Sequence, residues 1–228
     1  MSGAKALKTL ERQVIECRCC PRLVAWREEV ARVKRRAYRG YEYWGKPVPG
    51  FGDPNARILA VGLAPGAHGS NRTGRMFTGD ASGDFMYASL HRFGLASCPT
   101  AVSRDDGLTL KDVFITAVAR CVPPQNKPTP EEIRSCQPWL EAELELLTKV
   151  QGVVLLGKIA LDGLLWLPKF SRVPKKDVLF GHGALYRLTG GLPWLLCSYH
   201  PSQQNTQTGK LSAKMFDAIW QTALELLV

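Results

Sequence analysis

The sequence has no apolar run long enough to span a membrane, because a transmembrane helix needs about 20 such residues. Near its start, Lys5 and Lys8 bracket only Ala6 and Leu7, and no apolar core of a signal peptide follows. These absences predict a cytoplasmic protein with no membrane partner. Cysteines stay reduced in that compartment, so the seven cysteines favour metal or cluster ligation over a disulfide framework.

Two common nucleotide-binding motifs, G-x-G-x-x-G and G-x-x-x-x-G-K-[ST], are also missing. A different glycine-rich stretch is present at residues 62–80, GLAPGAHGSNRTGRMFTGD, directly after the apolar run 58–61. A buried strand, a glycine-rich loop and a helix from Ser82 onward predict a pocket for a phosphate or a base. An ordinary strand-to-helix connection has the same pattern, so this stretch alone leaves both interpretations open.

Acidic residues are scarce relative to basic ones. The chain has 30 Lys and Arg against 20 Asp and Glu, a net charge of +10. Residues 1–50 carry 12 of the basic and five of the acidic residues, which gives 12 − 5 = +7. A basic run lies at residues 32–39. This imbalance favours a polyanionic partner, nucleic acid or anionic lipid, although plain solubility would also account for it.

Four nearly continuous apolar runs predict buried strands, at residues 58–61, 112–119, 152–157 and 194–199. Helical patterns separate them, and one helix begins with a capping box formed by Thr129 and Glu132. This alternation predicts one α/β domain with a parallel sheet covered on both faces. Ligands of such sheets bind beyond the carboxyl ends of the strands. We therefore expect residues 62–80, 120–127, 157–158 and 200–206 to meet in one cleft.

The cysteines form a candidate metal site. Cys17 and Cys20 make a C-x2-C pair, and Cys121 and Cys136 make a wider one. Four thiolates suit zinc or an iron–sulfur cluster. Spacing alone favours zinc, and scattered buried thiols with no metal remain an alternative. Cys19 is a possible extra ligand, whereas Cys98 and Cys197 fit unligated thiols.

The glycine-rich stretch, the segment PPQNKPTPEE and the segment YHPSQQNTQTG together carry a family resemblance. Over nearly its whole length the chain resembles the bacterial and archaeal family 5 uracil-DNA glycosylases. The resemblance implies a three-layer α/β/α sandwich with a four-stranded parallel sheet, in one domain over residues 1–228. It also implies a structural [4Fe–4S] cluster on Cys17, Cys20, Cys121 and Cys136, in place of zinc. This cluster would tie the basic segment of about 50 N-terminal residues to the body.

The implied activity is monofunctional hydrolysis of the N-glycosidic bond of uracil in double-stranded DNA, which leaves an abasic site. Hypoxanthine, etheno bases and 5-substituted pyrimidines are further expected substrates. Leu63 and Ala64 stand where other families carry an acid, and Ala117 where they carry a base-reading asparagine. These departures imply another water-activating group and a looser choice of base. We expect a monomer associated with the nucleoid; a non-catalytic iron–sulfur or zinc protein that binds nucleic acid is the alternative.

The resemblance assigns catalytic roles to three residues. Asp80 is expected to direct water and support the cationic sugar, although an Asp before a helix is also a common cap. His200 is expected to donate a hydrogen bond to the departing base, and Asn126 to hold water or base. Phe77 is expected to stack on the extruded base. Each of the last three residues could have a structural role instead. His200 could be a polar residue at a strand end, Asn126 a turn residue, and Phe77 a core residue.

The remaining predicted contacts fall into two groups. The backbone that begins the first loop is expected to cradle the base, with residues Gly62, Leu63, Ala64, Pro65 and Gly66. Other residues are expected to contact DNA, the last five of them in the minor groove: Ser70, Arg72, Pro201, Ser202, Gln203, Gln204 and Asn205. His68 is left without an assigned role.

Overall fold

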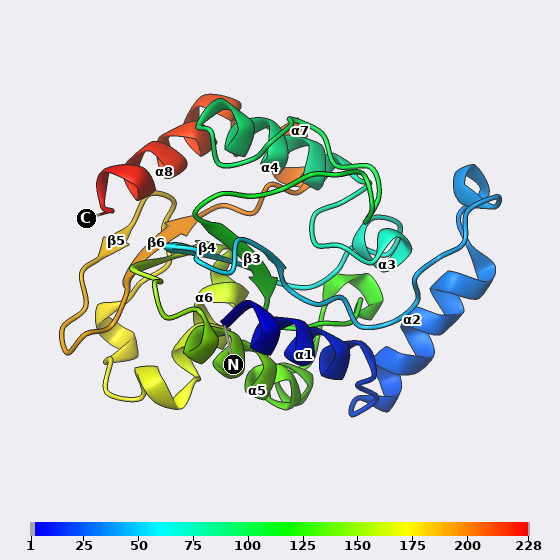
Figure 1. Ribbon diagram of the computed structural model, residues 1–228, viewed down its shortest axis with the longest axis horizontal. Helices are drawn as coiled ribbons and strands as arrows, with labels where there is room; N and C mark the ends of the chain where they lie inside the picture. Colours follow the sequence, from blue (N-terminus) through cyan, green and yellow to red (C-terminus); the bar gives the residue numbers. More distant parts are fainter. Residues whose placement is uncertain (1–2, 228) are drawn as a thin grey trace.

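A six-stranded mixed sheet lies at the centre of the structure, a computed structural model that describes residues 3–227 (Figure 1). The strands are β1 (Phe51–Gly52), β2 (Ile58–Gly62), β3 (Val113–Ala117), β4 (Gly152–Leu156), β5 (Leu185–Tyr186) and β6 (Trp194–Ser198). Their order across the sheet is β1-β3-β2-β4-β6-β5. The four five-residue strands are mutually parallel, with Ala60 of β2 opposite Ile115 of β3 and Val154 of β4. Their carboxyl ends therefore share one edge.

The expectation of a four-stranded, wholly parallel sheet is wrong, because one further strand lies at each edge of the four parallel strands. β1 pairs with β3, and β5 with β6, and both pairings are antiparallel. Each edge strand has only two residues and neither is fully buried. A segment this short contains too few residues to show an alternating pattern, which explains why the sequence did not reveal it.

Helices cover both faces of the sheet, as expected for a three-layer α/β/α arrangement (Figure 1). The α-helices are α1 (Gly3–Ile15), α2 (Pro21–Val33), α3 (Ser70–Thr73), α4 (Ala81–Arg92), α5 (Pro130–Leu146), α6 (Lys158–Leu165), α7 (Gln203–Gln207) and α8 (Ala213–Glu225). Helices α4 and α8 lie on one face, and α1, α5 and α6 on the other. Alternate residues of β2 enter two core clusters, Ile58 and Ala60 one, and Leu59 and Val61 the other.

Single-turn 3-10 helices interrupt the loops at Arg36–Tyr38, Pro124–Asn126, Pro168–Phe170 and Lys175–Asp177. The capping box before α5 is confirmed, because Thr129 and Glu132 exchange side-chain and backbone hydrogen bonds. No helix within residues 3–227 combines the length and apolarity that crossing a bilayer requires.

Candidate active site

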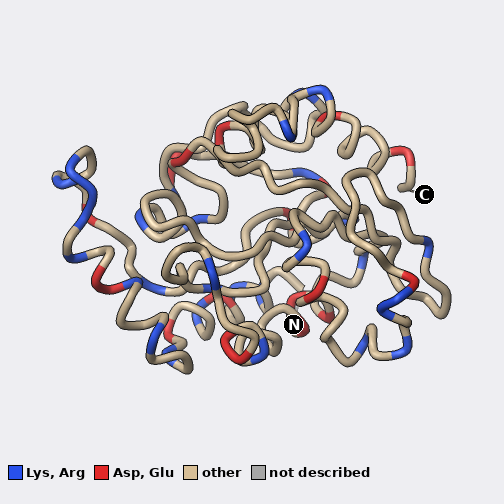
Figure 2. The backbone as a smooth tube through the Cα atoms, turned by 180° about the vertical axis from the view of Figure 1, so that it is seen from behind, with Lys and Arg blue, Asp and Glu red and all other residues tan. Residues whose placement is uncertain are grey.

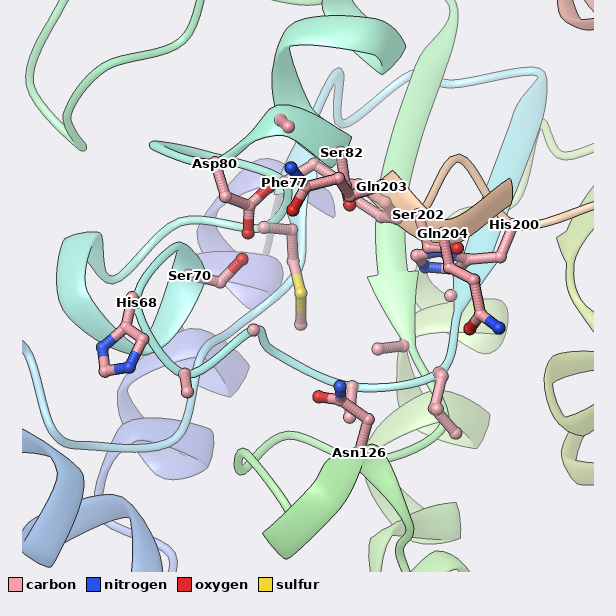
Figure 3. Close-up of a pocket in the computed structure, with 18 residues that line it drawn as sticks. His68, Ser70, Phe77, Asp80, Ser82, Asn126, His200, Ser202, Gln203 and Gln204 are labelled. Carbon is pink, nitrogen blue, oxygen red and sulfur yellow. The ribbon is translucent and has the colours of Figure 1, made fainter. Parts of the chain in front are cut away.

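A pocket of about 530 Å³ opens at the carboxyl edge of the parallel strands (Figure 3). It is lined by the loop after β2, by Asn126 from the turn after β3, and by His200 and neighbours after β6. The segment after β4 was expected here too, but it does not line this pocket. Lys158 instead pairs with Asp162 one turn along α6, at 2.5 Å.

Apart from the four cysteines, sixteen residues were predicted to take part in catalysis, base binding or DNA contact, and the pocket brings together twelve of them. They are Gly62, Leu63, Ala64, Gly66, Ser70, Phe77, Asp80, Asn126, His200, Ser202, Gln203 and Gln204. Four others, Pro65, Arg72, Pro201 and Asn205, lie outside the lining. The structure thus gives the position of all sixteen residues, whereas the chemical role of each one stays a prediction.

Asp80 caps helix α4 and also faces the pocket, so the two interpretations of this residue are compatible. Its Oδ1 accepts a hydrogen bond from the backbone N–H of Gly83 at 3.0 Å. The carboxylate turns toward the Ser70 hydroxyl (Figure 3). Burial raises the pKa of Asp80, and hydrogen bonds from the backbone of Gly83 and Ser82 oppose that rise. A raised pKa brings a carboxylate closer to the range in which a general base works best.

Two glycines make room for this carboxylate. A Cβ at Gly69 would lie 1.8 Å from Asp80 Oδ2, and one at Gly66 would lie 2.9 Å from it. We expect Gly69→Ala to slow the reaction in this pocket roughly 10²-fold, because a displacement of about 1 Å at the group predicted to be catalytic costs about that much. The matched control is Gly181→Ala, whose new methyl would meet Ala184 Cβ at an ordinary 3.8 Å. Equal single-turnover rates for the two variants would contradict this account.

Phe77 and His200 form a stacked pair at the back of the pocket. Their ring centroids lie 5.7 Å apart with an interplanar angle of 29°. Phe77 has a φ of 51°, a left-handed conformation that costs on the order of 1–3 kcal/mol for a bulky residue. Within residues 3–227 no protein group hydrogen-bonds the His200 imidazole, and burial lowers its pKa to about 4. The ring is therefore neutral at pH 7, with a nitrogen available to a ligand.

The low pKa of His200 predicts a pH-dependent stability. An unfolded histidine has a pKa near 6.5, so between pH 6.5 and about 4 the unfolded chain binds the extra proton. Stability is therefore lost as pH falls through that window. From pH 7 to pH 5 we expect the parent to lose roughly 1–2 kcal/mol more than His200→Gln. Urea unfolding at both pH values measures this difference, and equal losses would contradict it.

Asn126 reaches the pocket from a strained turn. It and Gln125 have φ values of 57° and 55°, and asparagine tolerates this left-handed region better than most residues. Its side chain points into the pocket (Figure 3). Its backbone N–H donates to the carbonyl of Pro123 at 3.2 Å, but no hydrogen bond within residues 3–227 holds its side-chain amide, so the side-chain donor and acceptor are both free for a ligand.

His68 is a pocket residue that sequence reasoning left without a role. Its Nδ1 lies 3.1 Å from the Tyr43 hydroxyl, and the two rings meet edge to face. Burial and the positive charges of Arg35 and Arg72 lower its pKa. Its place in the glycine-rich loop was the only available signal, because Tyr43 comes from a distant segment.

Two predicted DNA contacts are occupied with internal bonds. The buried Arg72 donates from Nε to the carbonyl of His68 and from Nη2 to that of Gly79, both at 2.7 Å. Asn205 donates from Nδ2 to the carbonyl of His200 at 2.8 Å. Arg72 thus closes the first loop and Asn205 fixes α7 beside His200, while their contacts with DNA stay predictions.

The four candidate ligand cysteines lie near one another. Cys20 and Cys121 share a small buried cluster with Leu23. Burial raises the pKa of Cys121 to about 11 and that of Cys136 to about 12, and the neighbouring thiols add to both increases. Cys17 is half-buried and acts on the pKa of both Cys20 and Cys121. Among the described residues, no group of three or more His, Cys, Asp or Glu side chains is arranged to hold a single metal ion.

A buried arginine accompanies these thiols. Arg27 is 2% exposed, and its Nη1 lies 3.0 Å from Cys121 Sγ. Its Nε has no hydrogen-bond partner among the described residues, and the carboxylate of Glu28 is 4.0 Å away and half-exposed. Protonated thiols supply no counter-charge to this guanidinium. The site therefore fits a buried anionic group bound between the thiols.

The comparisons with known proteins agree with this geometry. A sequence model of the uracil DNA glycosylase superfamily matches residues 49–224. A Type-5 uracil-DNA glycosylase of Thermus thermophilus is 58% identical over 210 residues, 92% of this chain and 93% of the relative. Those of Mycobacterium leprae and Pyrobaculum aerophilum are 51% and 42% identical, covering 98% and 92% of this chain and 97% and 89% of the relatives. The chain therefore belongs to the uracil-DNA glycosylase superfamily and, within it, to the Type-5 family.

Proposed function

We propose that the chain is a DNA-repair glycosylase that hydrolyses the N-glycosidic bond of uracil and leaves an abasic site. The observation that carries this proposal is the convergence of Asp80, Asn126 and His200 on one pocket at the carboxyl edge of the sheet. The chain's relatives are named uracil-DNA glycosylases, which supports the same reaction class.

The reaction begins with extrusion of the target nucleotide, because its glycosidic bond cannot be reached inside the stack. As the bond from C1′ to the base breaks, the sugar gains oxocarbenium character and the base takes the electron pair. Asp80 orients a water toward C1′ and stabilises the cationic sugar. The water adds its oxygen to C1′ and transfers a proton to the Asp80 carboxylate, and the departing base anion takes up a proton from solvent.

The other pocket residues act on the departing base. Neutral His200 donates a hydrogen bond from a ring nitrogen to the base oxygen on which negative charge develops. The free amide of Asn126 holds the base or the attacking water. Phe77 already stacks on His200, so it fixes that imidazole and presents its remaining ring surface to the base.

The apolar part of the pocket wall supports a broad choice of base, and the expected minor-groove insertion of residues 201–205 supports double-stranded DNA as the substrate. Leu63, Ala64 and Ala117 line the pocket, and none of their side chains can read the hydrogen-bonding edge of uracil. Discrimination by hydrogen bonding is then left to Asn126 and His200, and a wall that is apolar at these three positions rejects other bases less strongly. We therefore include hypoxanthine, etheno bases and 5-substituted pyrimidines among the substrates.

The test uses duplex oligonucleotides that each carry one lesion. Release of free uracil, with an alkali-labile break at that position, is the expected result. A panel with hypoxanthine, ethenocytosine and 5-hydroxymethyluracil, each as duplex and as single strand, measures the range. Salt-sensitive DNA binding with no free base from any lesion would favour the non-catalytic alternative.

We further propose a structural [4Fe–4S] cluster on Cys17, Cys20, Cys121 and Cys136. Four thiolates around such a cluster carry net negative charge, which supplies a buried counter-charge to Arg27, whose paired carboxylate on Glu28 is 4.0 Å away and half-exposed. When held by Cys17 and Cys20 on one side and by Cys121 and Cys136 on the other, the cluster would link α2 to the segment that carries Asn126. A cluster is larger than one ion, so its ligands need not converge on a single point.

This proposal predicts a visible spectrum and a ligand-specific loss. The protein purified without oxygen should be brown and contain about four iron atoms per chain. Cys136→Ser should lose most of the iron and colour, because the residue is buried among the other thiols. Cys98→Ala, which changes a half-buried thiol outside the set, is the matched control. Full iron content in Cys136→Ser would contradict the ligand assignment.

A further inference from the structure

A basic arm projects from the body of the molecule beyond the end of α2. It consists of residues 34–41, KRRAYRGY, and includes the 3-10 turn Arg36–Tyr38. In Figure 1 it stands clear of both helical layers, and in Figure 2 its tip is rich in Lys and Arg. We call this segment the 34–41 arm.

The 34–41 arm is held in one shape by its own contacts. Lys34 Nζ donates to the carbonyl of Tyr41 at 2.7 Å and so joins the two ends of the arm. The backbone N–H of Tyr41 donates to the carbonyl of Tyr38 at 3.1 Å. The two tyrosine rings meet edge to face with centroids 5.8 Å apart. The arm is therefore ordered before any partner binds, which lowers the entropic cost of binding.

Arg72 fastens the arm to the pocket loop. Its guanidinium carbon lies 4.2 Å from the centroid of Tyr38 and 5.1 Å from that of Tyr41. The same guanidinium bonds the carbonyls of His68 and Gly79, which belong to the loop that lines the pocket. One buried cation thus connects the arm to the loop that ends at Asp80.

The outer charges of the arm have no acidic partners. Arg35, Arg36 and Arg39 are exposed, and none of them forms an ion pair within residues 3–227. Other arginines of the N-terminal segment differ in this respect: Arg18 pairs with Glu28, Arg22 with Glu132, and Arg32 with Glu29. Three free guanidiniums on a rigid support suit phosphate groups, which arginine binds bidentately.

We propose that the 34–41 arm is a second DNA-binding element. It binds backbone phosphates beside the extruded nucleotide, and Arg72 fixes the position of the arm relative to the pocket. The inference rests on the proposed function for the orientation of the DNA. It commits to a phosphodiester backbone, since the pocket beside the arm is the one assigned to a nucleotide. Anionic lipid is the competing occupant and is tested separately.

The experiment compares two triple variants that remove equal charge. Arg35→Gln/Arg36→Gln/Arg39→Gln changes the arm. Lys169→Gln/Arg172→Gln/Lys176→Gln changes three exposed residues in the segment 168–177, which lies on the far side of the body (Figure 2). Circular dichroism and thermal unfolding check that both fold. Fluorescence anisotropy then gives the Kd for an undamaged and a uracil-bearing duplex over a series of salt concentrations.

We expect the arm variant to bind both duplexes on the order of tenfold more weakly at low salt. The slope of log K against log salt should become shallower by roughly 0.9 for each phosphate that the arm no longer neutralises, and by at most about 2.7. The 168–177 variant should keep nearly the parent slope. Parent-like binding by the arm variant, or equally weakened binding by the 168–177 variant, would overturn the proposal.

Two further measurements separate the alternatives. No glycosidic bond is cleaved when the protein binds undamaged duplex, so this binding measurement tests the arm independently of glycosylase activity. Sedimentation with vesicles of anionic and neutral phospholipid tests the competing occupant. Vesicle binding that depends on the arm, together with parent-like DNA binding, would assign the arm to a membrane surface instead.

Discussion

Asp80→Asn should lower the rate of uracil release by roughly 10²- to 10⁴-fold, the contribution that a positioned acid or base usually makes. Asparagine is chosen because it caps helices about as well as aspartate, so the bond from Gly83 to position 80 can persist. The substitution therefore removes the carboxylate charge and leaves α4 in place. Thermal unfolding should show little change, and affinity for the uracil-bearing duplex should stay near that of the parent.

The dependence of the rate on pH distinguishes the loss of a general base from a structural disturbance of the active site. In the proposed mechanism the rate of the parent depends on ionised Asp80, so we expect it to fall as pH decreases through the raised pKa of that residue. In Asp80→Asn this acidic limb should disappear, because no proton is taken up at that position. Asp84→Asn is the matched control, since it removes the same charge from an exposed site one turn along α4. If the Asp80→Asn variant releases uracil at the parent rate, the catalytic role assigned to Asp80 is contradicted.

The position of Asp80 could be predicted from two local signals, the apolar run at residues 58–61 and the glycine-rich stretch that follows it, together with one rule of sheet topology. Apolar runs identified the four central strands, and parallel strands place their following loops at one edge. That reasoning brought Asp80, Asn126 and His200 together without any knowledge of tertiary contacts. It failed for Lys158, because a loop at the correct edge need not contribute to the pocket wall.

What the sequence could not reveal are contacts between distant segments. Tyr43 meets His68, and Arg27 meets Cys121, through side chains 25 and 94 positions apart. Helix α2 escaped detection for a related reason. It buries the charged side chain of Arg27 among its apolar ones, so a search for apolar periodicity underestimates the face that it turns inward.

The largest expected effect on stability comes from Glu143 of α5. Its carboxylate accepts bonds from Arg120 at 2.6 and 2.9 Å and from the Thr116 hydroxyl at 2.6 Å. The side chains of Arg120 and Glu143 are only 1% and 3% exposed. Glu143→Ala removes the counter-charge and should destabilise the fold by about 3–5 kcal/mol. Among the described residues, Arg120 Nε has no hydrogen-bond partner, so Glu143→Ala would leave a buried guanidinium with still fewer partners.

Urea unfolding measures this destabilisation, with Glu131→Ala on the exposed first turn of the same helix as the control. The double variant Arg120→Met/Glu143→Leu should recover most of the stability, because replacing a whole buried pair is far less costly than breaking it. Arg120 directly precedes Cys121, and its backbone contacts the Cys136 thiol. The ion pair therefore anchors the segment on which both the thiol set and the Asn126 turn depend. If Glu143→Ala unfolds at the parent urea concentration, the pair does not fix that segment, and the thiols must hold the turn by themselves.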